Sequence, residues 1–206
     1  MPSELSTIRH AKQALLLAWP RIMEECLSVL GSELHYQAMV YYCLRTYGQI
    51  PASQLGMNVK MWVDNPKTKV FKACDKRKHE NYRGGCEPIP DVVIFRPSIR
   101  GDWRRRNFEK TLKRMLIAIE LKASERSDAR LRPGEIIHDI EKLAAHREEV
   151  KHRRSTMYPV VMVIDSAPEG VERMTSSGIE AILGKGRQLD VGILYCSPTR
   201  EVNAVD

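Results

Sequence analysis

The run from Met115 to Ala123, MLIAIELKA, constrains the fold of this chain more than any other stretch. It is rich in Ile and Leu and is followed by polar residues, as expected for a strand that is buried on both faces of a sheet. One carboxylate, Glu120, and one amine, Lys122, interrupt the apolar run. Because side chains alternate along a strand, both are expected on the same face. Buried charges are costly unless they meet a counter-charge, hydrogen bonds or a metal, so other segments must supply partners.

A second apolar strand is expected upstream, over Ile89 to Phe95, with Asp91 near its beginning. Pro90 is compatible with this position because the first residue of a strand need not donate to the ladder. If the two strands pair, Asp91 and Glu120 bring two carboxylates together with the amine of Lys122 beside them. Two carboxylates and an amine form a site for a hard cation and an activated water.

The combination of Pro90-Asp91 with Glu120-Leu121-Lys122 resembles the signature of the PD-(D/E)xK nuclease superfamily. The motif is short, and its weight comes from its context of two apolar strands with helical segments around them. The resemblance implies the restriction-endonuclease-like fold, a central mixed β-sheet flanked by helices. It also implies that Asp91, Glu120 and the backbone carbonyl of Leu121 bind Mg²⁺, for which Mn²⁺ can substitute, and that Lys122 assists catalysis.

The rest of the chain favours an α/β fold with an N-terminal helical segment. With 206 residues the chain is long enough for one well-packed domain and short for two, so we predict a single domain over 1–206. Predicted helices over 3–30 and 33–47 form the N-terminal segment, 1–48, and the sheet core spans 57–197. Further strands are expected at 59–63, 69–74, 158–164 and 190–196, further helices at 134–152 and 171–183, and no regular structure in the last ten residues.

The two N-terminal helices carry specific expectations about caps and buried faces. Ser3 or Ser6 is expected to cap the first helix, and Pro20 either kinks this helix or opens a second one. Ser32 is expected to cap the next helix, and Gly48 to end it. The core stripe of that helix is predicted as follows: Leu34, Ala38, Tyr41 and Tyr42.

Glu33 lies in the first turn of the second predicted helix. In the superfamily that the motif resembles, a helix before the first strand often offers a glutamate to the metal site, and Glu33 matches that role by its order along the chain. The alternative is that Glu33 only complements the positive end of the helix dipole, as many first-turn glutamates do. Both interpretations stay open at the level of sequence.

The chain carries 33 Lys and Arg against 26 Asp and Glu, a net charge of +7, which suits a polyanionic partner such as nucleic acid. The segment from Arg96 to Arg114 is densely basic, with aromatic residues interleaved. Guanidinium groups bind phosphate and aromatic rings stack on bases. We therefore predict nucleic-acid contacts, beside the candidate site, from Arg100, Trp103, Arg104, Arg105, Arg106 and Lys110. The alternative is a solvated basic loop whose aromatic side chains belong to the core.

Other sequence features indicate the cellular compartment and whether the chain associates with a membrane. Five cysteines at irregular spacing argue against a disulfide scaffold and favour a reducing compartment, so a cytoplasmic protein is expected. No apolar run approaches the roughly 18 residues of a membrane span, so no membrane partner is expected. Asp139 and Lys142, near the start of the helix predicted at 134–152, are interpreted as a surface pair without a chemical role.

Together with the resemblance, these features predict a Mg²⁺-dependent phosphodiesterase that acts on nucleic acid, and a DNA endonuclease is favoured. Its catalytic residues are predicted to be Asp91, Glu120, Lys122 and Glu33, and its substrate is expected to be double-stranded DNA. A homodimer or a partner subunit is compatible with this activity. The main alternative is a non-catalytic nucleic-acid-binding subunit of the same fold in a recombination, restriction or repair assembly. A metabolic α/β enzyme ranks last because no glycine-rich nucleotide loop follows a strand.

Overall fold

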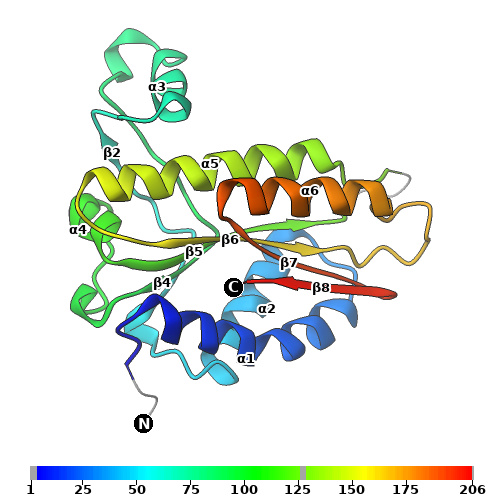
Figure 1. Cartoon of the computed structure of the whole chain (residues 1–206). Coiled ribbons are helices and arrows are strands. Elements are labelled where there is room, and N and C mark those ends of the chain that lie inside the picture. Colours follow the sequence, from blue (N-terminus) through cyan, green and yellow to red (C-terminus); the bar gives the residue numbers. More distant parts are fainter. Residues whose placement is uncertain (1–3, 126–128, 206) are drawn as a thin grey trace.

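A six-strand mixed sheet forms the centre of the computed structural model, which describes residues 4–125 and 129–205 except for the side chain of Arg106. The strand order is β1-β4-β5-β6-β7-β8 (Figure 1). The pairs β5–β6 and β6–β7 are parallel, and the other neighbouring strands are antiparallel. The strands span Leu55–Met57 (β1), Val92–Phe95 (β4), Met115–Ala123 (β5), Tyr158–Ile164 (β6), Gly192–Ser197 (β7) and Arg200–Ala204 (β8). The predicted α/β class and mixed sheet are confirmed.

Helices cover both faces of this sheet (Figure 1). On one face lie α1 (Ile8–Leu27) and α2 (Glu33–Thr46), and on the other lie α5 (Pro133–His152) and α6 (Ser176–Leu189). A short helical segment, η1 (Ala52–Gln54), precedes β1, and three more lie between β4 and β5: η3 (Pro97–Ile99), η4 (Arg105–Asn107) and α4 (Phe108–Lys113). Among the described residues, none of the helices combines the length and the apolar character that crossing a membrane requires.

Residues 63–86 form a lobe that projects beyond α5 (Figure 1). The lobe contains β2 (Val63–Asp64), α3 (Lys69–Lys76), η2 (Glu80–Tyr82) and β3 (Gly85–Cys86), and β2 pairs with β3 antiparallel. The strands expected at 59–63 and 69–74 are therefore wrong. Thr68 accepts the N–H of Phe71 and begins a helix where the sequence had suggested a strand.

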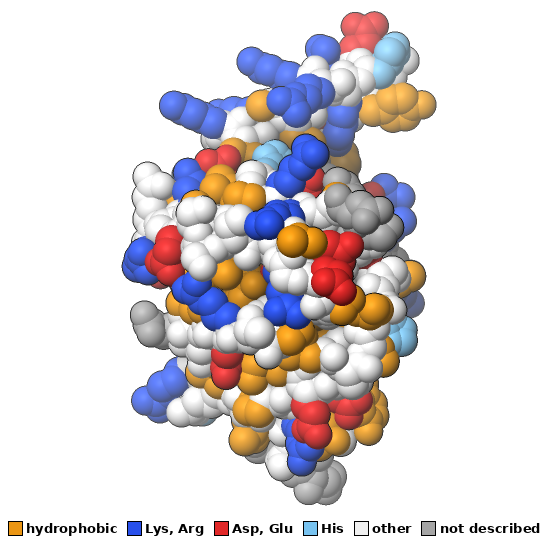
Figure 2. Space-filling view, turned by 90° about the vertical axis from the view of Figure 1, so that its right-hand side faces the viewer, with side chains coloured by type: hydrophobic (Ala, Val, Ile, Leu, Met, Phe, Trp, Pro, Cys, Tyr) orange, Lys and Arg blue, Asp and Glu red, His pale blue; other side chains and the backbone are white. Residues whose placement is uncertain are grey.

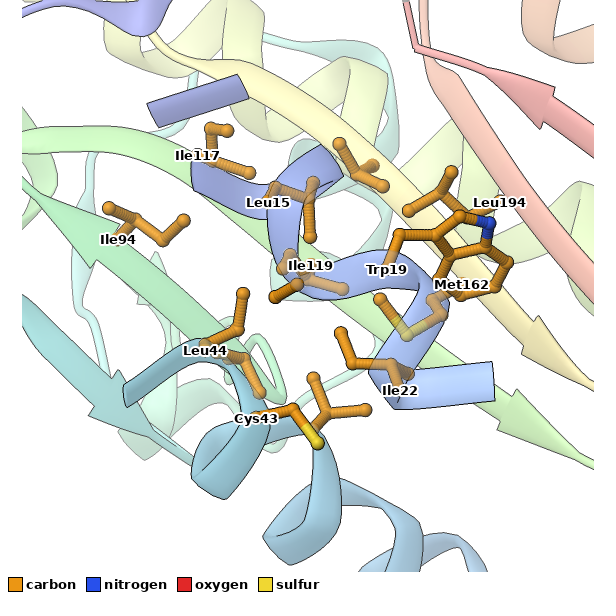
Figure 3. Close-up of a cluster of buried hydrophobic side chains, with 14 of the residues drawn as sticks. Leu15, Trp19, Ile22, Cys43, Leu44, Ile94, Ile117, Ile119, Met162 and Leu194 are labelled. Carbon is orange, nitrogen blue, oxygen red and sulfur yellow. The ribbon is translucent and has the colours of Figure 1, made fainter. Parts of the chain in front are cut away.

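Strand β5 divides its side chains between two hydrophobic cores. Ile117 and Ile119 pack toward α1 and α2, where they meet Leu15 (Figure 3). The intervening positions point to the other face, so Glu120 and Lys122 lie on the side covered by α5. The predicted strand 115–123 and the shared face of its two charged residues are confirmed.

The N-terminal helices differ from prediction in their caps and buried faces. α1 begins after Thr7, whose hydroxyl accepts the N–H of His10, and not after Ser3 or Ser6. Pro20 lies within α1, so it neither ends this helix nor opens a second one. Ser32 caps α2 as predicted.

The predicted core stripe of α2 is wrong for three of its four residues; the fourth, Tyr41, is partly buried and packs against the core. Leu34 and Tyr42 are exposed, and Ala38 is exposed as well. The buried residues are instead Tyr36, Gln37, Val40, Cys43 and Leu44. Apolar residues occur on more than one side of this helix, so periodicity alone did not identify the face that packs against α1 and the sheet.

The C-terminal part is more regular than predicted. The helix expected at 171–183 is α6 at Ser176–Leu189, because Thr175 accepts the N–H of Gly178 and caps it. The last residues, expected to be irregular, form the edge strand β8, which pairs with β7. An edge strand has one unpaired side and can be polar, so the composition of this segment concealed it.

The division into two cores predicts how mutations in α1 act. Leu15 is fully buried, whereas Leu17, two residues later in the same helix, is 62% exposed. Leu15→Ala is expected to lower the free energy of unfolding by about 2–5 kcal/mol, because truncating a buried leucine leaves a cavity. Leu17→Ala serves as the matched control and should change it by less than about 0.5 kcal/mol. Chemical denaturation of both variants tests this, and equal effects would contradict the assigned packing of α1.

Candidate functional site

Asp91 and Glu120 meet where β4 begins and β5 ends. Val92 pairs with Ile119 in the antiparallel ladder. The same register places the preceding residue, Asp91, opposite the following residue of β5, Glu120. Opposite residues on one face have Cβ atoms about 4.5–5.5 Å apart. Asp91 Oδ2 accepts the backbone N–H of Leu121 at 2.6 Å, which fixes its carboxylate beside the strand that carries Glu120.

Lys122 brings the start of α2 into the same cluster. Its Nζ lies 3.3 Å from Glu33 Oε2 and 3.4 Å from Asp139 Oδ2. Glu33 therefore does more than complement a helix dipole, because its side chain faces the charged end of β5. All four side chains that the sequence proposed as catalytic lie in one connected cluster.

Helix α5 contributes two residues whose importance the sequence interpretation missed. Lys142 Nζ lies 2.9 Å from Glu120 Oε1 and 3.4 Å from Asp139 Oδ1. Their interpretation as a surface pair is wrong, since Asp139 is only 7% exposed. Position 139 falls on the buried stripe of α5 with Ile136 and Leu143, and that spacing was a usable signal.

Gln37 is a further buried member of the cluster, one turn after Glu33 on α2. Its Nε2 donates to Asp91 Oδ1 at 2.8 Å, and its Oε1 accepts from Asn58 Nδ2 at 3.0 Å. Asn58 also donates its backbone N–H to the Asp91 carbonyl. These bonds fix the position and orientation of Asp91.

Positive charge compensates the two opposed carboxylates only in part. Burial, followed by the charge of Glu120, raises the pKa of Asp91 to about 7, although the Leu121 N–H acts against this rise. Burial also raises the pKa of Glu120, and Lys142 only partly counteracts it. Glu120 Oε2 is buried and has no hydrogen-bond partner among the described residues. An additional cation at this position would relieve both effects.

Both lysines of the cluster are held in the charged form. Burial acts to lower the pKa of Lys122, but the carboxylates of Asp139, Glu33 and Glu120 outweigh it and raise that pKa. The pKa of Lys142 is raised in the same way, with Glu120 as the main opposing charge. Both side chains are therefore ammonium groups at neutral pH, suited to donate hydrogen bonds and stabilise negative charge rather than to accept a proton.

The carboxylates of this cluster suit Mg²⁺, which keeps several of its waters, better than a metal ion that is bound only by protein ligands. Within the described residues, no three His, Cys, Asp or Glu side chains form a ready-made metal site. Mg²⁺ usually keeps several waters and binds through one or two carboxylates plus substrate phosphate. Asp91 and Glu120 supply two carboxylates, one with an unpartnered oxygen. The N–H and C=O of a strand residue point to the same neighbouring strand, so the Leu121 carbonyl also lies on the side of Asp91.

Solvent reaches the cluster from the side of Lys122. A cavity of ≈ 200 Å³ opens there and is lined by Glu33 and Lys122 together with the segment that follows β5 and the start of α5. This face of the molecule, with charged side chains of both signs, is the one shown in Figure 2. A polar substrate therefore has access to the charged end of β5.

The basic segment between β4 and β5 does not adjoin this cluster, contrary to expectation. It leaves the C-terminal end of β4 and enters the N-terminal end of β5, whereas Asp91 and Glu120 lie at the opposite ends of these strands. The separation along β4 is roughly 13 Å at about 3.3 Å per residue. Antiparallel pairing makes this unavoidable, because the connection and the site must lie at opposite edges.

Within that segment the predicted contact residues have different surroundings. The Trp103 ring stacks on Phe95 at a centroid distance of 5.2 Å and packs against the core, as the alternative interpretation expected. Arg104 pairs with Asp102 at 2.8 Å and Arg105 with Glu87 at 2.7 Å. Arg100 and Lys110 are exposed. The side chain of Arg106 lies outside the described part of the structure. Their binding of nucleic acid stays a prediction.

Comparison of the chain with protein-family models, curated proteins and solved structures finds no match. The argument for function therefore rests on the geometry and electrostatics of the cluster itself.

The raised pKa of Asp91 predicts a specific pH dependence of stability. Between its ordinary value of 3.8 and about 7, the folded state binds more protons at Asp91 than the unfolded state does. The contribution of Asp91 to stability therefore decreases as pH rises through this window. The amide that replaces this carboxyl in the variant Asp91→Asn does not titrate in this window, so the variant does not lose this contribution. The free energy of unfolding of the variant minus that of the native protein should therefore increase, by on the order of 1 kcal/mol or more, from pH 4 to pH 8.

Denaturation at several pH values, with and without Mg²⁺, measures this difference. Mg²⁺ should stabilise the native protein at pH 8 and should stabilise Asp91→Asn much less, since binding to the folded state adds stability by mass action. Asp190→Asn is the matched control, because Asp190 is an exposed aspartate with φ of 51°, a conformation that asparagine tolerates. Parallel pH profiles for the native protein and Asp91→Asn would contradict the assigned environment of Asp91.

Proposed function

We propose that this chain is a Mg²⁺-dependent nuclease that hydrolyses phosphodiester bonds, most simply as a DNA endonuclease. The observation that carries the proposal is the convergence of Asp91, Glu120 and Lys122, from two different strands, at one edge of the sheet. The two carboxylates are only partly compensated by positive charge, and Glu120 Oε2 has no hydrogen-bond partner among the described residues. The ammonium group of Lys122 lies on β5, two residues after Glu120. This combination suits the binding of a divalent cation and an anionic substrate.

The topology around the cluster supports the resemblance to the PD-(D/E)xK superfamily and its restriction-endonuclease-like fold. An antiparallel pair, β4 and β5, carries the motif residues, and α5 then leads to β6, which pairs parallel with β5. A helix before the first of these strands, α2, supplies Glu33. The order of these elements is what the resemblance implies for a central mixed sheet with flanking helices.

In this proposal Asp91, Glu120 and the Leu121 carbonyl hold the metal ion. When bound, Mg²⁺ polarises the scissile phosphate and lowers the pKa of a coordinated water. Gln37 and the Leu121 N–H hold the Asp91 carboxylate in place through hydrogen bonds of 2.8 and 2.6 Å. Fixed ligands of this kind need little rearrangement on binding, which favours catalysis.

Lys122 serves as an electrostatic group because its raised pKa keeps it charged. Its ammonium stabilises negative charge that develops on the phosphoryl oxygens and orients the attacking water by donating to it. Glu33 and Asp139 hold this ammonium at the end of β5. Lys142 neutralises Glu120 in the metal-free protein, with Nζ 2.9 Å from Oε1.

The same ion pairs favour a second candidate function. Lys122 and Lys142 neutralise the carboxylates internally, and a cluster balanced in this way can serve only to stabilise the fold. The chain would then be a non-catalytic nucleic-acid-binding subunit of a recombination, restriction or repair assembly. Salt-sensitive binding of DNA without metal-dependent cleavage would identify this function.

Plasmid cleavage tests the proposal. The purified chain should nick or linearise supercoiled DNA in the presence of Mg²⁺ or Mn²⁺ and should be inactive with EDTA. Asp91→Asn and Lys122→Met should each lower the cleavage rate by at least about 100-fold, because each removes charge aimed at the reacting phosphate.

Matched controls separate chemistry from loss of folding. Asp190→Asn and Lys113→Met remove the same kinds of charge from surface positions outside the cluster and should cut at the native rate. Thermal unfolding should show that all four variants fold. Cleavage at the native rate by both Asp91→Asn and Lys122→Met would refute the proposed active site.

A further inference from the structure

A groove between the projecting lobe and α5 leads toward the candidate active site. Its volume is ≈ 380 Å³, within the roughly 300–1,000 Å³ of small-molecule sites. One wall is α3 and the other is the part of α5 that carries His138 and Lys142. Apolar residues, including Phe71, Cys86 and Pro88, complete the lining together with Glu87, which pairs with Arg105. Lys142 lines the groove and also contacts Glu120, so this one side chain connects the groove with the carboxylates.

The lobe is the strongly basic part of this side of the molecule. Residues 63–86 contain seven Lys and Arg and three Asp and Glu, a net +4 in a chain whose total is +7. Figure 2 shows Lys and Arg side chains gathered on the lobe where it rises above the body. Tyr82, in η2, presents an aromatic ring that is 72% exposed. Exposed cations near an exposed aromatic ring suit phosphate contacts and base stacking.

α3 presents two adjacent faces to a ligand. Exposed lysines that form no ion pair within the described part of the chain recur at spacings of three and four: Lys69, Lys72 and Lys76. The face turned to the groove has mostly small or apolar side chains and ends in a guanidinium: Val70, Ala73, Cys74 and Arg77. The backbone of duplex DNA has the same two components, charged phosphates and less polar sugars.

The lobe is fixed to the body, so the groove has a defined width. Glu149 of α5 accepts the backbone N–H groups of Lys67 and Thr68 at 2.7 and 2.6 Å. Arg153 Nη2 donates to the Asp64 carbonyl at 2.6 Å. Within the lobe, Asp75 accepts the N–H groups of Gly84 and Gly85, so this carboxylate caps a turn, and it forms no ion pair with a lysine among the described residues.

We propose that the lobe is a DNA-binding arm and that the groove holds one strand of duplex DNA beside the scissile phosphate. The inference rests on the proposed function for the position of the cut, but the arm binds DNA whether or not cleavage follows. The lysines of α3 contact the phosphates of the backbone, Arg77 and His138 line the path of the strand, and apolar side chains complete the lining. This basic surface is distinct from the segment between β4 and β5.

Affinity for a fluorescent 20-base-pair duplex, measured in EDTA over a salt series, tests the arm. Lys72→Ala with Arg77→Ala should weaken binding at least fivefold. In a plot of the logarithm of the association constant against the logarithm of the salt concentration, the slope should become less negative by about 0.9 for each phosphate that the variant no longer neutralises. The control is Arg9→Ala with Arg21→Ala, which removes two exposed cations from α1 on the opposite face of the sheet. Equal effects of the two double variants would overturn the assignment of the arm.

Cys74 reports on the groove itself. It is the exposed cysteine on the groove wall, and the other four cysteines of the chain are buried. Saturating duplex should slow maleimide alkylation of Cys74 at least tenfold, as followed by intact-protein mass spectrometry. Unchanged alkylation under saturating DNA would overturn occupancy of the groove, and equal protection by polyglutamate would show a general polyanion or acidic-protein surface instead.

The outcomes separate this inference from the proposed nuclease activity. If the Lys72→Ala, Arg77→Ala variant binds and cuts DNA like the native protein, the arm is wrong and the nuclease assignment stands. If the native protein binds DNA through the arm and protects Cys74 but never cuts, the arm stands and the catalytic assignment is wrong.

Discussion

The electrostatic balance of two opposed, buried carboxylates determines how this end of the molecule is built. Asp91 and Glu120 are only 7% and 6% exposed. Among the described residues, nearby positive charge does not offset the burial of Asp91, and Glu120 Oε2 has no hydrogen-bond partner. Carboxylates so placed are costly unless something compensates them. Lys142 supplies one compensating charge, and backbone and amide hydrogen bonds supply part of the rest. Burial, followed by the charge of Glu120, still raises the pKa of Asp91 to about 7, and a bound cation would offset both effects.

The fold brings the members of this cluster together from distant parts of the chain. The register of β4 with β5 sets Asp91 against Glu120, the start of α2 supplies Glu33 and Gln37, and α5 covers the same face with its own charged pair. Each contribution depends on an element whose other face is packed in a hydrophobic core. Stability of the sheet and geometry of the site are therefore linked, although the residues that provide them differ.

The sequence allowed prediction of the centre of the site but not of its surroundings. The apolar run of β5 was long and unambiguous, so the shared face of Glu120 and Lys122 followed from strand periodicity. Asp139 was misjudged because a charged residue on a helix is usually solvated, and only the stripe of α5 showed otherwise. The basic segment after Phe95 lies away from the site because β4 and β5 are antiparallel, and their apolar patterns alone do not give the relative direction of the two strands. The lobe was missed because its short strands and helix are defined by caps and tertiary contacts rather than by hydrophobic periodicity.

The central claim is that Asp91 and Glu120 together bind one divalent ion. The most direct test is the anomalous scattering of crystals grown with Mn²⁺, which locates the ion independently of catalytic activity. The account predicts a single strong peak within about 2.5 Å of carboxylate oxygens from both residues, with Lys142 displaced from Glu120. A map at saturating Mn²⁺ without a peak there, and with Lys142 still bonded to Glu120, would contradict it.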